Sequence, residues 1–161
     1  MSTSTSTAFG AHSSASASAR SGSGTTLYAA DPLLLLGRVL LGSIFVVSGF
    51  GKITAVAAFA ASLEKRGVPY ASTLAMIGAC VEFFGGLAIV LGVEVRYVAA
   101  LMVAFVIVAT LISHRFWELH DAARQAQATQ FSKNVAIIGG FVTLLAAGGG
   151  RYAVERLWRR S

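Results

Sequence analysis

The sequence predicts an all-α integral membrane protein, a four-helix bundle that follows a disordered N-terminal tail. Two observations support this fold class. Only 12% of the 161 residues are charged and 55% are hydrophobic, whereas an average soluble domain has about 25% charged residues. The apolar residues also form four runs with basic residues at their edges, which is the pattern of helices that cross a lipid bilayer. The net charge of +6 lies at these edges and at the C-terminus, so it does not indicate nucleic-acid binding.

Residues 1–30 are predicted to form the disordered tail. Residues 1–26 are rich in Ser, Thr, Ala and Gly, a composition that cannot bury enough apolar surface to offset the entropy of the chain. Asp31 and Pro32 then predict the start of the first helix, because Asp is a common cap and Pro is tolerated in the first turn.

The four apolar runs predict membrane-spanning helices within one domain, residues 31–150. A run of nineteen residues such as the first covers about 29 Å at 1.5 Å per residue, which matches the hydrocarbon core of a bilayer. The stretch ITAVAAFAASLEKRG after the first run is predicted to continue as a helical piece that lines the bundle or lies at the interface. The stretch HRFWELHDAARQAQATQ is too charged to cross. The predicted spans are residues 33–51, 73–92, 95–113 and 134–148.

An even number of spans places both termini on the same side of the membrane. Residues 151–161 contain four arginines and are predicted to form a basic C-terminal tail, either solvated or attracted to anionic lipid. Because basic residues favour the cytoplasmic side, this cluster predicts that both termini are cytoplasmic.

Two predicted spans carry charged residues and glycines on a single face. Small residues let the backbones of membrane helices approach closely, so both faces are expected to point into the bundle, and Gly42, Gly49, Gly78 and Gly86 are the expected packing positions. The face of the first span contains Arg38, Gly42, Phe45, Gly49 and Lys52, and the face of the second contains Gly78, Glu82 and Gly86. In the third span the sequence favours a face with Arg96, Ala100, Val103, Ile107 and His114.

Glu82 requires compensation, because a carboxylate within an apolar run is costly in a membrane. Counted from the predicted helix ends, Arg38 and Glu82 differ in depth by about 7–8 Å at 1.5 Å per residue. An Arg38–Glu82 ion pair is therefore the leading hypothesis. Two structural alternatives remain open: the pair only sets the helix register, or a protonated Glu82 bonds to backbone. His114 and His120 are poorly spaced for a metal, and no metal site is predicted.

Four segments together resemble the DoxX family of small bacterial membrane proteins. These are GRVLLGSIFVVSGFGKI (37–53), VEFFGGLAIVLGVEVRYVA (81–99), SHRFWEL (113–119) and QFSKNVAIIGG (130–140). The resemblance implies a four-helix fold, a location in the bacterial inner membrane and an association with redox metabolism. The matching polar positions, which are the candidate ligand-binding residues, are Arg38, Lys52, Glu82, His114, Lys133 and Asn134.

The redox association indicates a membrane subunit or adaptor of a quinone-linked or oxidative-stress complex, not an enzyme that acts alone. The chain has one cysteine, no pair of intramembrane histidines and no nucleotide-binding loop, so the electron-carrying centre is assigned to a partner protein. A quinone is the one small molecule considered, since it requires only an apolar cleft and a few polar groups. The alternatives are a small transporter that uses the Arg38–Glu82 pair, a stand-alone quinone-linked enzyme and a purely structural membrane protein.

Overall fold

The computed structural model describes the backbone of residues 18–158 and the side chains of residues 30–158. All regular structure in this part of the chain is helical, so the predicted all-α fold is confirmed. The helices are α1 (Ser18–Thr54), α2 (Val56–Glu64), α3 (Ala71–Leu91), α4 (Val95–Ser113), the short 3-10 helix η1 (Phe116–Glu118), α5 (Asp121–Ala147) and α6 (Glu155–Trp158).

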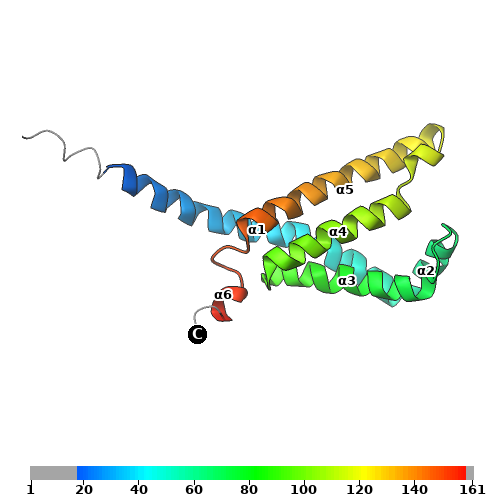
Figure 1. The fold of residues 1–161 in the computed structure, drawn as a ribbon, viewed down its shortest axis with the longest axis horizontal. Coiled ribbons are helices and arrows are strands. Elements are labelled where there is room, and N and C mark those ends of the chain that lie inside the picture. The colour runs from blue at the N-terminus through cyan, green and yellow to red at the C-terminus, as the bar shows by residue number, and fades with distance from the viewer. Residues whose placement is uncertain (1–17, 159–161) are drawn as a thin grey trace, which may run out of the picture.

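Within the described residues, four helices are long and apolar enough to cross a membrane, as predicted. They form two antiparallel pairs, α1 with α3 and α4 with α5. The pairs meet near the α3–α4 turn and diverge toward α2 and η1, so that the bundle has the shape of a V (Figure 1). We call the end at the α3–α4 turn the closed end and the end at α2 and η1 the open end.

Helix α1 does not begin at Asp31. It is continuous from Ser18 and contains Pro32 in its interior, although its apolar, membrane-spanning part begins at Ala30, close to the predicted boundary. Residues 1–17 of the predicted tail lie outside the described residues. The carboxylate of Asp31 does not cap a helix, because its Oδ1 atom accepts a hydrogen bond of 2.7 Å from the backbone N–H of Arg151. Asp31 therefore connects α1 to the C-terminal segment.

Helix α5 begins at Asp121, well before the predicted start of the fourth span. Its 27 residues cover about 40 Å, more than a bilayer core requires. Phe131 contacts Phe116, just beyond the end of α4, so the residues that precede Phe131 extend past that end. Hydropathy marks only the part of a helix in lipid, whereas Ala, Arg and Gln residues continue the helix readily in water. For this reason the sequence pattern did not predict that residues 121–133 belong to the helix.

The interface of α1 and α3 is closely packed at three of the four predicted glycines. A Cβ atom at Gly49 would lie 2.5 Å from the backbone nitrogen of Phe83, and one at Gly86 would lie 2.8 Å from the carbonyl oxygen of Gly42. Only glycine permits this approach. Gly78 differs, because the nearest atoms to a Cβ at that position would be 3.9 Å away. A Cβ atom at residue 78 would make only ordinary van der Waals contacts with Phe59 and Phe105, so packing at this position does not require glycine.

The face that α4 turns inward is not the face that begins with Arg96. Arg96, Ala100 and Ile107 are exposed. A shift of one residue rotates a helix face by about 100°, and apolar residues on either face suit lipid equally well. The buried face consists of Val95, Ala99, Met102, Val106 and Thr110.

The first part of the predicted C-terminal tail is folded against the closed end. The N–H groups of Val154 and Glu155 donate to the carbonyl oxygens of Leu91 and Gly92, at 3.2 and 3.1 Å. The Glu155 carboxylate accepts a hydrogen bond of 3.0 Å from the backbone N–H of Val95. The ends of α3 and α4 leave such backbone groups without helical partners, and the C-terminal segment supplies them. Residues 151–158 are thus an integral part of the bundle.

Candidate ligand-binding cleft

Glu82 forms an ion pair with Lys52 near the open end. The Nζ atom of Lys52 lies 2.5 Å from the Oε2 atom of Glu82. Glu82 is 5% exposed, on the inward face of α3, and Lys52 is in the last turn of α1. Lys52 also donates to the hydroxyl of Ser48 at 3.1 Å, and its Nζ atom is 5.3 Å from the centroid of the Phe59 ring. The cation therefore has three favourable neighbours, which together compensate its position within the bundle.

Arg38 is not the partner of Glu82, and the hypothesis of an Arg38–Glu82 pair was wrong. Arg38 lies at the closed end, where it is completely buried. Its Nη2 atom donates to the carbonyl oxygen of Tyr152 at 3.2 Å, and the carboxylate of Glu155 attracts the guanidinium. Arg38 is about 21 Å along α1 from Lys52, at 1.5 Å per residue.

The error arose from the register of α1 against α3. The prediction placed Leu33 level with Gly92, on the assumption that the two helices end at the same depth. In the structure α1 extends past the α3–α4 turn, and Arg38 is level with Gly92, because a Cβ atom at Gly92 would overlap its Nη1 atom. In the predicted register Lys52 and Glu82 differ in depth by about 13–14 Å. A shift of five residues reduces this difference to about 6 Å, which the long Lys52 side chain spans.

The α4–α5 pair carries a second set of polar groups. The Nδ2 atom of Asn134 donates to the Thr110 hydroxyl at 2.8 Å, and that hydroxyl donates to the carbonyl oxygen of Val106 at 2.6 Å. One turn further toward the open end, the Nδ1 atom of His114 is 2.7 Å from the Oε1 atom of Gln127. Hydrogen bonds between membrane helices stabilise their association, so these contacts hold α5 against α4.

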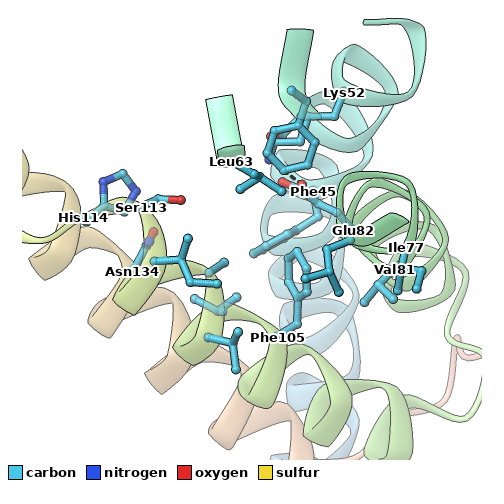
Figure 2. Close-up of a pocket in the computed structure, with 18 of the residues that line it drawn as sticks. Phe45, Lys52, Leu63, Ile77, Val81, Glu82, Phe105, Ser113, His114 and Asn134 are labelled. Carbon is cyan, nitrogen blue, oxygen red and sulfur yellow. Dashed lines mark hydrogen bonds and ion pairs between the residues drawn. The ribbon is translucent and has the colours of Figure 1, made fainter. Parts of the chain in front are cut away.

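Between the two helix pairs lies a cleft of about 470 Å³. Its lining is mainly apolar and includes Phe45, Phe105 and Ile77. Figure 2 shows Lys52 and Glu82 on one wall, and His114 with Asn134 on the opposite wall. Pockets that bind small molecules have this character: an apolar lining with a few polar groups that orient the ligand.

The structure brings four of the six candidate residues to this cleft. These are Lys52, Glu82, His114 and Asn134. Arg38 is at the closed end, and Lys133 is exposed on α5, outside the lining.

Four further residues, which line the cleft or bond to its polar residues, were not predicted. Ser48 could have been found, because it precedes Lys52 by one helical turn. Thr110 is a single hydroxyl in an apolar run, which is a weak signal. Phe59 and Gln127 carry no signal in the sequence, since their roles depend on how α2 and the first part of α5 pack. The expectation that residues 53–67 include a lining helix is confirmed by Phe59 and Leu63 of α2.

The fold and the cleft define a class: an integral membrane protein of four spans with an ion pair inside the bundle. The DoxX family model matches residues 33–115. The chain belongs to the DoxX family, as the resemblance in its sequence implied.

Two proteins of Escherichia coli strain K12 are similar over most of their length. The inner membrane protein YqjF is 32% identical over 127 residues, which are 79% of this chain and 92% of YqjF. The inner membrane protein YphA is 30% identical over 129 residues, 80% of this chain and 92% of YphA. Both names support an inner-membrane location for this protein. No solved structure gives a significant match.

Proposed function

We propose that this protein is a membrane subunit of a redox complex and that it binds a quinone in the cleft, with the electron-carrying centre on a partner protein. The observation that supports this proposal is the combination of apolar lining and opposed polar groups around a volume of about 470 Å³. Small-molecule sites typically have volumes of about 300–1,000 Å³. The volume of the cleft lies within this range and is large enough for a substituted quinone ring.

The chemistry of a quinone suits the two walls. Its ring is flat and apolar, which matches contacts with Phe45 and Phe105. Its two oxygen atoms lie at opposite ends of the ring and require polar partners. The Lys52 ammonium is available on one wall, held by Glu82 and Ser48, and His114 and Asn134 are available on the other.

The transport alternative loses its specific basis. It relied on Arg38 and Glu82 as a pair within the membrane, but Glu82 pairs with Lys52 and Arg38 bonds to the C-terminal segment. Flux of ions or solutes into liposomes that contain only the purified protein would restore the transport hypothesis and count against the adaptor.

The quinone proposal predicts that protein purified in mild detergent contains a quinone among its extractable lipids. A short-tailed benzoquinone should also bind, measured by quenching of tryptophan fluorescence. Lys52→Met should weaken this binding roughly tenfold, the effect of one lost hydrogen bond to a charged group. Lys133→Met removes an equal charge from an exposed position and should bind as the wild type does. Equal affinities of the two variants would contradict the proposal.

We also propose that both termini are cytoplasmic. Support comes from Arg151 and Arg156 at the closed end, because basic residues are enriched on that side of the membrane. The open end and the cleft would then be in the periplasmic half of the bilayer. A green fluorescent protein fused to the C-terminus should therefore fluoresce, and an alkaline phosphatase fusion at the same position should be inactive. Activity of the phosphatase fusion would reverse the topology.

A further inference from the structure

His114 belongs to the cleft lining, and a hydrogen bond to Gln127 fixes the tautomer of its ring. It follows the last residue of α4 and is half-buried. Its Nδ1 atom lies 2.7 Å from Oε1 of Gln127. Since an amide oxygen only accepts, the Nδ1 atom carries the proton of this hydrogen bond. In the neutral ring the Nε2 atom then has a free lone pair. His114 lines the cleft and Gln127 does not. Because Gln127 engages the Nδ1 atom, the Nε2 atom is the nitrogen left for a ligand.

The other polar groups of the cleft differ in character from His114. Lys52 is a cation that can only donate. One oxygen of Glu82 accepts from Lys52 at 2.5 Å. One N–H of the Asn134 amide donates to Thr110 at 2.8 Å, which leaves that amide a second N–H. One wall thus offers a charged donor, and the opposite wall offers the neutral acceptor of His114 beside the remaining N–H of Asn134.

This asymmetry distinguishes the two redox forms of a quinone. The oxidised form has two carbonyl oxygens, which only accept hydrogen bonds. They can use Lys52 and the remaining N–H of Asn134, but they cannot use the Nε2 lone pair of His114. The reduced form, the quinol, has hydroxyl groups that both donate and accept. A quinol can accept from Lys52 at one end of the ring and donate to the Nε2 atom of His114 at the other end.

We propose that His114, oriented by Gln127, binds a ligand hydroxyl, so that the cleft selects the quinol over the quinone when the imidazole is neutral. This inference rests on the proposed function and specifies the redox form that is held. Gln127 is a positioning residue, since it acts through His114. Protonation of the imidazole changes the Nε2 atom from an acceptor to a donor, so acid should abolish the selectivity.

Several charged or titratable groups lie on the elements around His114. Arg115 and Glu118 form an exposed pair at 3.5 Å, and Lys52 and Glu82 form the pair across the cleft. The remaining groups, on the adjoining loop and on α5, are His120, Asp121, Arg124 and Lys133, all exposed. Exposed charges are screened by solvent and salt, so the protonation state of the His114 imidazole is the variable of the test, which covers about pH 5 to 8.

The test uses the full chain in lipid nanodiscs under argon, with a short-tailed benzoquinone and its quinol as probes. The dissociation constants of both forms are measured by tryptophan quenching across that pH range. In the wild type the quinol should bind roughly tenfold more tightly than the quinone at the upper end of the range, and the two should converge in acid. His114→Phe should bind both forms similarly at every pH.

Gln127→Glu provides the sharper variant. A carboxylate beside the Nδ1 atom favours the protonated ring, so the loss of quinol selectivity should move to higher pH. Gln125→Glu adds the same charge at an exposed position of α5 and should leave the pH profile unchanged.

The outcomes separate this inference from the function on which it rests. A pH-independent selectivity in the wild type, or the same profile for Gln127→Glu and Gln125→Glu, would overturn the role of His114 while quinone binding itself stands. If neither form binds to the folded wild-type protein, the quinone function fails and this inference fails with it.

Discussion

Replacement of Lys52 by methionine is expected to destabilise the folded protein by about 2–3 kcal/mol. The substitution leaves the Glu82 carboxylate, 5% exposed, without its cation, and loss of one partner of a buried ion pair typically costs about 3–5 kcal/mol. The lower value is expected because the Lys52 side chain is 32% exposed, and solvent weakens such a pair. Thermal unfolding in detergent, followed by circular dichroism, measures the loss.

The double variant Lys52→Met/Glu82→Gln should recover part of this stability, because a neutral amide no longer requires a cation. The free energies of unfolding of the two single variants and the double variant should therefore be non-additive, with a coupling of at least about 1 kcal/mol. The matched cycle uses Arg38→Gln with Glu82→Gln, whose side chains are at different depths of the bundle. That cycle should be additive. An additive Lys52/Glu82 cycle together with a non-additive Arg38/Glu82 cycle would contradict the ion pair of the structure.

The Gly92→Ala substitution should be at least as damaging, with an expected loss of about 3 kcal/mol or more. Gly92 ends α3 with a φ of 79°, a left-handed conformation that costs a residue with a Cβ atom about 1–2 kcal/mol. The new Cβ would also overlap the Arg38 guanidinium and lie 2.7 Å from the Cα of Ala153. Displacement of both should release the C-terminal segment, so trypsin should cleave at Arg151 faster than in the wild type.

Substitutions at two other glycines separate the cost of the left-handed backbone from the cost of the steric overlap at Gly92. Gly67 has a φ of 75°, and nothing lies within 4 Å of a Cβ at that position, so Gly67→Ala should show the backbone cost alone. Gly37 is helical and equally open, and Gly37→Ala should leave stability unchanged or slightly increased, since Ala favours helices. If Gly92→Ala is no worse than Gly67→Ala, the Arg38 contact does not contribute to stability.

Part of the candidate site could be predicted from the sequence. Lys52, Glu82, His114 and Asn134 were identified because polar residues are costly in a membrane and are therefore informative wherever they occur. Their grouping into two opposed walls was not predicted. It depends on the divergence of the helix pairs toward the open end (Figure 1), which no local pattern encodes.

The sequence by itself determined the four spans, the residues at which α3 ends and α4 begins, and the inward faces of α1 and α3. These properties are local: the length of an apolar run sets a span, and glycines mark where backbones can touch. Only the tertiary structure decided the register of α1 against α3, and with it that Glu82 pairs with Lys52 and not with Arg38. The physical reason is that lipid solvates apolar side chains as well as protein does. Depth and facing direction therefore depend on contacts such as those of Arg38 with Tyr152, which join residues far apart in the chain.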